Sequence, residues 1–520
     1  MSDLDRGLVS FPMASRRLSR RTVLRFGLIA AAIPLAAACG QAAAPAPTAA
    51  PAKPAEAPKP AEAPKPAAPV AQPGATAAPA AQAPAVPKAK ISGKLTFVQS
   101  RDFHPDHNTF IEQKVREFAE KQGYPLDHSY IEAYAGAGNV VQKLTAAVQA
   151  GDAPDLITHT LRPAELKFLE IIEDVDSLHK DIIKEQGKVI PAAEKRGLLD
   201  GKWWTVPHFS RAGGYWARET AFREGGIDYK KDLGDYGACR EACLKASKPE
   251  KELWGWGLTA NRSGDGETMV RDIVMMWGGQ LTDESGQVVV LNKDPFRAYA
   301  IAGLEFLKET YTDPKWATML PPGVNAWTDP SNNEAYLAGK IFFTSNAGTM
   351  FAKAVVDKNP VAEDTWLIPT PKGLGAGGRS IMGAADTMNW FIMKGSKNRE
   401  AAEQLIKFIV SPDVMRETFK ISTGYVYPAH EWGWDEKVIT EDKFGQHVTD
   451  IWKRKAFDPS GYTAGEWPGP PTPWTTALEN SNFWTDMFGE VLGGKSVPDA
   501  LKSAHDRAVR VFKEFGAKGE

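Results

Sequence analysis

The stretch from Arg101 to Asn108 places three potential metal ligands, His104, Asp106 and His107, inside four positions. Three ligands so close together on a proline-containing loop match no zinc-binding spacing. We therefore expect no metal at this loop. Its polar side chains, Arg101 and His104 among them, are interpreted as contacts to a bound molecule or as caps of the helix that follows.

The sequence lacks the short motifs that mark serine hydrolases and zinc peptidases. The glycine-rich run GLGAGGR (373–379) follows Pro-Thr-Pro and opens no predicted helix, so its context is wrong for a dinucleotide site. No G-x-S-x-G or H-E-x-x-H pattern occurs. We therefore expect neither an enzyme nor a cofactor. A glycoside hydrolase needs only two suitably separated carboxylates, and 64 acidic residues leave that alternative open.

The first 40 residues predict export and attachment to a membrane. The apolar run 26–38 is too short to span a bilayer, and several arginines precede it, as in an export signal. Residues 19–25 resemble a twin-arginine signal. Residues 36–40 resemble a bacterial lipobox, which implies that Cys39 is acylated and becomes the mature N-terminus. We expect a signal at 1–38 and a lipid anchor on Cys39, on the outer face of the cytoplasmic membrane.

Residues 39–90 consist mainly of Ala and Pro and include the repeat KPAEAPKPAEAPKP, which predicts an extended, disordered tether. Residues 91–520 are too many for one hydrophobic core and predict two or three domains. A net charge of -2 argues against a nucleic-acid partner. Cys239 and Cys243, four apart on a predicted helix, fit either a disulfide or two buried thiols, and we assign them no function.

The folded part begins with alternating strand and helix patterns. The predicted strands are 94–100, 126–133 and 155–159, and the first helix is expected to hold Thr109 and Glu112 in its first turn. Strand-helix-strand units of this kind form parallel sheets with right-handed crossovers. Ligands in open sheets bind beyond the carboxyl ends of the strands. Here these ends are 100–102, 133–136 and 158–160.

Four longer stretches carry a resemblance to one family. They are KLTAAVQAGDAPDLI (143–157), DGKWWTVPHFSRAGGYWARETAFREGGI (200–227), AYLAGKIFFTSNAGTM (335–350) and MNWFIMKGSKNREAAEQLIKFIVSPDVM (388–415). In this order they resemble the family 1 extracellular solute-binding proteins of ABC importers. The second stretch resembles the aspartate-glycine-lysine hairpin of that family. The first stretch resembles the turn by which a helix in that family leads into the next strand.

The resemblance implies an α/β protein with the class II two-lobed periplasmic-binding-protein fold, each lobe a mainly parallel sheet flanked by helices. We expect a first lobe of 91–206 plus about 346–390, and a second of about 207–345 plus 391–520. The lobes would close on a neutral solute and deliver it to the transmembrane permease subunits of the importer. We expect a monomer.

Aromatic residues point to the solute class. All 16 tryptophans lie between 203 and 484, and aromatic faces stack on sugar rings, so a sugar or oligosaccharide is expected; a polyol, a peptide or a glycerophosphodiester stays an alternative. Packing in the core is the other reading of each tryptophan. For Arg162, the other reading is a surface pair with Glu165. The predicted solute-binding residues are Arg101, His104, His159, Arg162, Trp277, Trp327, Ser345, Asn346, Asp386, Trp390, Trp467 and Trp474.

Overall fold

The computed structural model describes residues 88–132, 137–381, 386–442, 444–458 and 467–520. They belong to one compact unit, Lys88–Glu520. The predicted signal, Cys39 and the Ala/Pro-rich segment up to residue 87 lie outside the described residues. None of the helices in the described part of the chain combines the length and apolar composition needed to cross a bilayer.

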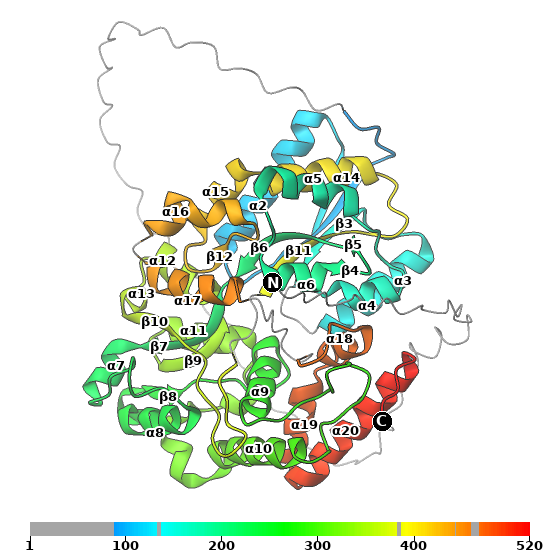
Figure 1. The fold of residues 1–520 in the computed structure, drawn as a ribbon. Coiled ribbons are helices and arrows are strands. Elements are labelled where there is room, and N and C mark those ends of the chain that lie inside the picture. Colours follow the sequence, from blue (N-terminus) through cyan, green and yellow to red (C-terminus); the bar gives the residue numbers. More distant parts are fainter. Residues whose placement is uncertain (1–87, 133–136, 382–385, 443, 459–466) are drawn as a thin grey trace, which may run out of the picture. The chain divides into compact units, whose positions relative to one another are not determined.

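Six strands form the larger of two main sheets (Figure 1). In spatial order they are β12 (Val426–Tyr427), β6 (Val206–Arg211), β11 (Asp386–Ile392), β3 (Leu156–His159), β1 (Leu95–Arg101) and β2 (Leu126–Glu132). Strand β1 pairs in parallel with β2 and with β3, which confirms the predicted strand-helix-strand units. Strand β3 is buried along its whole length, as expected for a central strand covered on both faces.

The helices that pack on this sheet, or on each other beside it, come from two parts of the chain. They are α2 (Pro105–Gln122), α3 (Ala137–Ala150), α4 (Pro163–Phe168), α5 (Asp176–Gln186), α6 (Pro191–Gly197), α14 (Arg399–Ile409), α15 (Pro412–Ile421) and α16 (Lys437–Thr440), with the 3-10 turn η5 (Glu431–Asp435). Helix α17 (Gln446–Ala456) follows α16 and packs on β10 (Thr365–Ile368) of the smaller sheet. Helix α2 begins at Pro105, before the predicted first turn at Thr109, because proline suits the first helical position.

The second sheet has four strands: β10 (Thr365–Ile368), β7 (Gly213–Arg218), β9 (Ile341–Ala347) and β8 (Trp254–Trp256). Around it lie α7 (Glu219–Glu224), α8 (Tyr236–Ala246), α9 (Gly264–Met276), α10 (Phe296–Thr312), α11 (Asp329–Leu337), α12 (Thr349–Val356), α13 (Val361–Asp364), α18 (Pro473–Glu479), α19 (Phe483–Leu492) and α20 (Val497–Glu514). The 3-10 turns here are η2 (Pro249–Lys251), η3 (Pro314–Met319) and η4 (Val324–Ala326).

A separate two-stranded hairpin joins β4 (Leu198–Leu199) to β5 (Lys202–Trp203). Its turn is Asp200-Gly201, and both residues have positive φ values, 51° and 76°. Such values are typical of the two-residue hairpin turn that Asp-Gly favours. The predicted aspartate-glycine-lysine hairpin is therefore confirmed.

The chain exchanges between the two sheets at short connections. Strand β6 ends at Arg211 and β7 of the other sheet begins at Gly213, with Ala212 between them. Strand β11 returns the chain to the larger sheet, where it runs antiparallel to both β3 and β6. The predicted two-lobed α/β fold is confirmed. The sheets are mixed rather than mainly parallel. In the larger sheet β11 pairs antiparallel with both of its neighbours, and in the smaller sheet β7 does the same.

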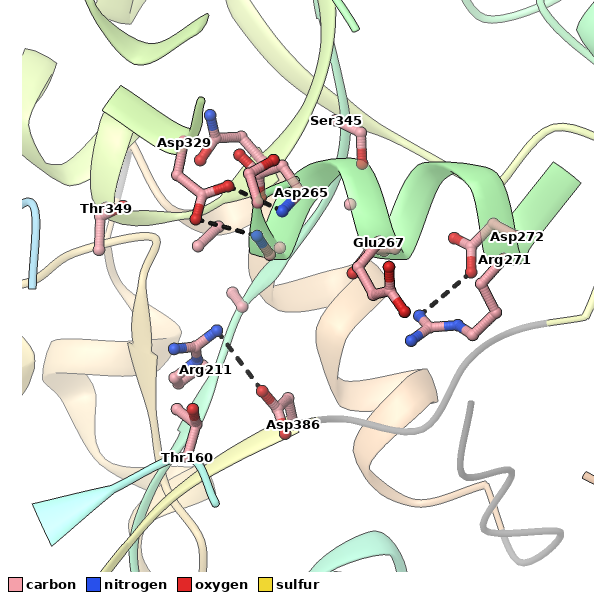
Figure 2. A pocket seen from close by; sticks show the side chains of 18 of the residues that line it. Thr160, Arg211, Asp265, Glu267, Arg271, Asp272, Asp329, Ser345, Thr349 and Asp386 are labelled. Carbon is pink, nitrogen blue, oxygen red and sulfur yellow. Dashed lines mark hydrogen bonds and ion pairs between the residues drawn. The ribbon is translucent and has the colours of Figure 1, made fainter. Parts of the chain in front are cut away.

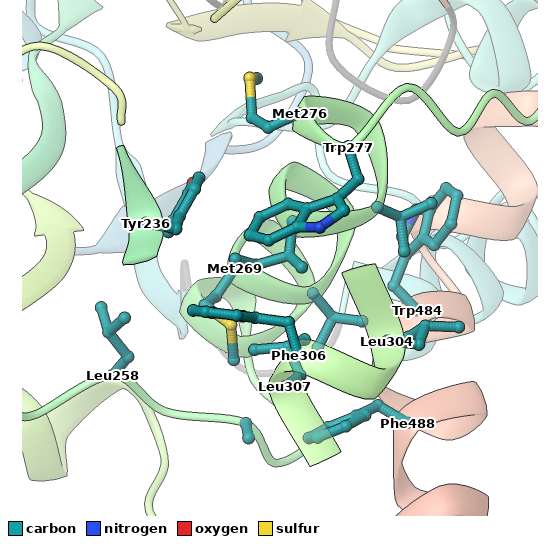
Figure 3. Packing of buried hydrophobic residues seen from close by; sticks show 14 of the residues in the cluster. Tyr236, Leu258, Met269, Met276, Trp277, Leu304, Phe306, Leu307, Trp484 and Phe488 are labelled. Carbon is teal, nitrogen blue, oxygen red and sulfur yellow. The ribbon is translucent and has the colours of Figure 1, made fainter. Parts of the chain in front are cut away.

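The smaller sheet's core is built around α9 and is rich in aromatic side chains (Figure 3). Trp277, at the end of α9, lies among Tyr236, Phe306 and Met269 in this core. Its ring centroid lies 4.8 Å from that of Phe306 and 5.5 Å from that of Tyr236. Cys239 and Cys243 are buried in the same core as free thiols. Trp277 is therefore a packing residue in this structure.

Candidate functional site

A cavity of about 350 Å³ lies between the two sheets and is lined from both sides. The larger sheet contributes the segments after β1 and β3, with Asp102 and Thr160, and the end of β6, with Arg211. These are carboxyl ends of strands, as predicted, while the third predicted end, at 133–136, lies outside the described residues. The smaller sheet contributes the start of β7, the end of β9 and one face of α9 (Figure 2).

Helix α9 forms a polar wall of the cavity. Asp265, Thr268, Asp272 and Met276 follow each other at intervals of three or four residues and therefore share one helical face, and all four line the cavity. The helix begins cleanly because its N-cap, Ser263, accepts a hydrogen bond from the backbone N–H of Gly266 at 3.0 Å.

Two carboxyl groups meet at the start of α9. Asp329 accepts hydrogen bonds from the backbone N–H groups of Gly264 (3.1 Å) and Asp265 (2.8 Å), and Asn332 donates to the Asp265 side chain at 2.9 Å. Burial raises the pKa of Asp265 and of Asp329, and for Asp265 the neighbouring Asp329 raises it further. A pair that retains a proton can both donate hydrogen bonds to a ligand and accept them.

Asp386, a predicted site residue, lines the cavity at the start of β11. Its carboxylate accepts a hydrogen bond from Arg196 at 2.9 Å and lies 3.5 Å from Arg211 (Figure 2 shows the second pair). Burial acts to raise the pKa of Asp386, but Arg211, Arg196 and Arg162 outweigh it and lower the pKa. The group is therefore an ionised acceptor flanked by guanidinium donors.

Arg162, also predicted, joins a chain of alternating charges across the cavity. It forms an ion pair with Glu479 of α18, not with Glu165. Glu479 also lies 3.8 Å from Arg271, which donates to Asp272 at 3.2 Å. This series of charged side chains runs from the segment after β3 to α9, so ion pairs link the two sides of the cavity.

Ser345 and Asn346 complete the predicted residues that line the cavity. They end β9, are each 5 % exposed, and the side-chain amide of Asn346 donates to the side-chain oxygen of Asn333, which is also a lining residue. Whether any of these residues contacts a solute stays a prediction; the structure brings Arg162, Ser345, Asn346 and Asp386 together at one cavity.

The other predicted residues of the larger sheet lie elsewhere. Arg101 is exposed, with its guanidinium 4.5 Å from the ring centroid of Tyr130. His104 is fully buried at the start of α2, where its Nε2 lies 3.0 Å from the carbonyl oxygen of Ile421. The described residues contain no cluster of three or more side chains suited to a metal. His159 is 1 % exposed, and its Nδ1 accepts the backbone N–H of Leu161 at 3.2 Å.

The predicted tryptophans do not line the cavity. Trp390 is fully buried in β11, with its ring stacked 5.1 Å from that of Phe97. Trp327 is half-buried against both cores, and Trp474 donates from Nε1 to the carbonyl of Gly286 at 2.7 Å. The tryptophan that does line the cavity is Trp452 of α17, which sequence reasoning did not select.

The glycine-rich run 373–379 has a structural role against α9. A Cβ atom at Gly373 would lie 2.1 Å from the carbonyl oxygen of Met276, so only glycine permits this approach. Arg379 donates to the carbonyls of Met275 (2.8 Å) and Gly279 (2.9 Å) at the end of the helix. Its guanidinium lies 4.2 Å from the ring centroid of Trp467, which places that predicted residue beside this loop.

Several lining residues were missed by sequence reasoning, notably Arg196, Arg211, Asp265, Asp272, Asp329 and Lys455. One signal in the sequence points to part of this set. In the segment SGDGETMVRDIVMM, Asp265, Thr268 and Asp272 form a polar stripe on a helix whose other positions are largely apolar. A polar stripe on a buried helix indicates a hydrated or ligand-filled space on that side.

Glu165 of α4 offers a test of the contact between α4 and α18. It is buried and accepts a hydrogen bond from Asn480 at 2.6 Å. Burial raises its pKa to about 7, although this hydrogen bond acts to lower the pKa. Between pH 4.5 and 7 the folded carboxyl retains a proton that the unfolded one has lost, so folding stability falls as pH rises. The free energy of unfolding of Glu165→Gln should not show this fall. Between pH 4.5 and pH 7 it should therefore rise by about 2 to 3 kcal/mol relative to that of wild type.

Urea unfolding at several pH values between 4 and 8 checks this expectation. The exposed Glu194→Gln on α6 is the matched control and should follow the wild-type profile. Parallel profiles for Glu165→Gln and wild type would contradict the raised pKa.

The comparisons with known proteins agree with this architecture. A family model described as bacterial extracellular solute-binding protein matches residues 106–416. A search among curated proteins found no match. The chain is similar in structure to maltose-bound MalE3 of T. maritima, with a TM-score of 0.65 and 19% identity over 80% of this chain and 99% of that one.

Two further solved structures are similar. The solute-binding protein of Agrobacterium vitis with bound D-mannitol has a TM-score of 0.64 and 18% identity, covering 82% of this chain and 100% of that one. The sugar transporter protein of Arthrobacter chlorophenolicus with bound laminaribiose has a TM-score of 0.64 and 16% identity, covering 81% and 99%. At these identities the similarity establishes the fold.

The family match extends over more than half of the chain and confirms the resemblance predicted from the sequence. The predictions of an exported protein and of a binding protein rather than an enzyme are confirmed with it. The chain belongs to the family of bacterial extracellular solute-binding proteins.

Proposed function

We propose that this protein is the solute-binding lipoprotein of an ABC importer and captures a sugar or polyol between its two lobes. The observation that carries the proposal is the cavity between the sheets, whose lining alternates guanidinium donors with carboxyl and amide groups. Sugar hydroxyls both donate and accept hydrogen bonds, so they suit such a lining. Structural neighbours were solved with maltose, D-mannitol and laminaribiose bound, which supports the same class of solute here.

The cavity's size favours a short solute. About 350 Å³ is near the lower end of the range usual for ligand sites. The aromatic side chains among its described lining residues are Phe103, Tyr215 and Trp452. Trp452 is 3 % exposed and donates from Nε1 to Ser210 at 2.8 Å, so little of its ring is available for stacking. We therefore propose a monosaccharide, a disaccharide or a polyol, held mainly by hydrogen bonds.

A ligand screen by thermal unfolding tests this function. A solute that binds only the folded protein should stabilise it by about 2.7 kcal/mol at a hundred times its Kd. Small-angle scattering of the same complex should show a smaller radius of gyration, because a ligand that contacts both lobes favours the closed form. No shift with any sugar or polyol would refute the proposal, and turnover of an oligosaccharide would favour the glycoside hydrolase alternative.

We propose lobe boundaries that follow the sheets. The first lobe would comprise 88–211 and 386–442, and the second 213–368, 446–456 and 473–520, in place of the predicted exchange points near 206, 345 and 390. Support comes from β10, which pairs with β7 of the smaller sheet, and from α14 and α15, which pack on α2 of the larger. Crystal structures with and without solute should concentrate their backbone dihedral changes at these exchange points.

We propose that the protein is attached to the membrane through Cys39. From the outer face of the membrane it would deliver the solute to the permease. The support is the lipobox-like sequence before the Ala/Pro-rich tether. Cys39→Ala should move the protein from the membrane fraction to the soluble fraction and leave its thermal unfolding unchanged. Thr48→Ala in the tether is the matched control and should stay in the membrane fraction. Retention of Cys39→Ala through salt and carbonate washes would contradict acylation.

A further inference from the structure

Lys455 is a buried cation at the cavity. It belongs to α17, lines the cavity and is 9 % exposed. Its Nζ lies 5.2 Å from the ring centroid of Trp452 on the same helix. A Cβ atom at Gly214 of β7 would lie 3.6 Å from this Nζ, an ordinary contact distance, so the ammonium group lies beside the start of β7.

The other cationic side chains of the cavity have carboxylate partners. Arg196 and Arg211 pair with Asp386, Arg162 pairs with Glu479, and Arg271 pairs with Asp272. Asp386 and Glu479 each face two guanidinium groups. Each of the cavity's arginines therefore has a carboxylate within ion-pair distance, although Asp386 and Glu479 are each shared by two of them.

Lys455 differs from these arginines, because no described residue forms a hydrogen bond or an ion pair with it. Asp272 is the acid whose charge acts on it, and that carboxylate is engaged by Arg271. Burial lowers the pKa of Lys455 to about 8, with Asp272 opposing, so the side chain is mainly charged at pH 7. A buried charge without a partner is costly unless something that enters the site compensates it.

We infer that Lys455 receives the carboxylate of an acidic solute, so that the cavity takes a sugar acid such as a hexuronate or an aldonate. This inference rests on the proposed function and names a narrower substrate class for the same cavity. Hydroxyl groups of the solute would bind the acid pair and amides around α9 and β9, and its carboxylate would accept hydrogen bonds from Nζ at the α17 side.

The charge count favours a carboxylate over a phosphate. Lys455 supplies one positive charge and, unlike each arginine, has no carboxylate at ion-pair distance among the described residues, so the vacant position beside Nζ matches a single negative charge. A phosphate monoester carries close to two negative charges at neutral pH, and its second charge would lie among the cavity's carboxylates. The neutral solute expected from the sequence would leave Lys455 uncompensated.

Matched pairs of small molecules test the inference by isothermal titration calorimetry at pH 7. The pairs are D-galacturonate with D-galactose, D-glucuronate with D-glucose and D-gluconate with D-glucitol, and D-glucose 6-phosphate is added as a phosphate probe. Wild type, Lys455→Met and Lys455→Arg are measured against all of them. Lys453→Met, an exposed position on the same helix, is the matched control. Thermal unfolding of each variant reports that it is folded.

For at least one pair, wild type should bind the acid at least about 30-fold more tightly than the neutral partner. Lys455→Met should remove this preference while keeping affinity for the neutral member, Lys455→Arg should retain part of it, and Lys453→Met should match wild type. Preference for the neutral members or for the phosphate overturns the inference and leaves the proposed function standing. An acid preference that survives Lys455→Met overturns the assignment to Lys455. Absence of binding to the whole panel overturns the inference, and the thermal screen with disaccharides and other polyols then decides the proposed function separately.

Discussion

Replacing Asp155 by asparagine is expected to lower the free energy of unfolding by about 3 to 5 kcal/mol at neutral pH. Asp155 is 4 % exposed and stands just before β3. Its carboxylate accepts hydrogen bonds from the backbone N–H and hydroxyl of Thr96, the hydroxyl of Ser396, the backbone N–H groups of Lys397 and Asn398, and the side-chain amide of Asn398. Asparagine would replace one acceptor oxygen by an N–H donor among these donors.

The pH dependence of this effect has a defined sign. Burial acts to raise the pKa of Asp155, but the hydrogen bonds from Asn398, Thr96 and Ser396 outweigh it and lower the pKa below 3.8. A lowered pKa stabilises the fold above the unfolded value, and this stability is lost as pH falls through the folded pKa. The difference between wild type and Asp155→Asn should therefore shrink below about pH 3.8.

Urea unfolding at pH 7 and at pH 3 checks both statements. Asp152→Asn, an exposed position in the same turn, is the matched control and should stay within about 0.5 kcal/mol of wild type. Equal stability of Asp155→Asn and wild type at pH 7 would show that the hydrogen-bonded carboxylate is unimportant.

Trp390→Ala should lower the free energy of unfolding by about 3 to 5 kcal/mol and leave solute affinity unchanged in the folded protein. The ring is fully buried in β11, between β3 and β6, and packs on Phe97 and near His208. Truncation leaves a cavity in the middle of the larger sheet, away from the lining residues of the site.

Chemical unfolding and titration calorimetry with a solute from the screen measure the two quantities separately. Trp390→Phe is the matched variant, since it keeps an aromatic ring, and should cost less than the alanine. A stable Trp390→Ala variant with lost affinity would place the ring at the solute and restore the aromatic platform predicted from the sequence.

Local sequence patterns were sufficient to predict the first strands and helices. Strands β1, β2 and β3 lie within a residue or so of the ranges predicted from alternating strand and helix periodicity. The family resemblance extended the prediction of elements to the rest of the chain. It could do so because the turns that the family shares depend on local residue types, as at Asp200-Gly201. The start of α2 was misplaced, since Thr109 and Glu112 form a capping pattern by spacing alone while Pro105 already starts the helix.

The predicted site residues that line the cavity were chosen by their position at strand ends, and those that do not line it include the tryptophans, which were chosen by residue type. Asp386, Ser345 and Asn346 begin or end strands that face the cavity, and Arg162 follows one, so strand direction predicts their place. The tryptophans were selected by residue type, and type does not distinguish a ring that stacks on a solute from one that fills a core. Trp277 and Trp390 lie in the two cores because large aromatic rings are the side chains that fill such spaces.

The sequence by itself determined the export and anchoring signals as predictions, the α/β class and the family, because each depends on short-range composition or on the order of local motifs. Tertiary structure alone decided which charges meet. Arg162 and Glu479, Arg211 and Asp386, and the unpartnered Lys455 come together only when the chain crosses between the sheets at Ala212 and returns through β11. Contacts between residues hundreds of positions apart depend on packing, which no local pattern encodes.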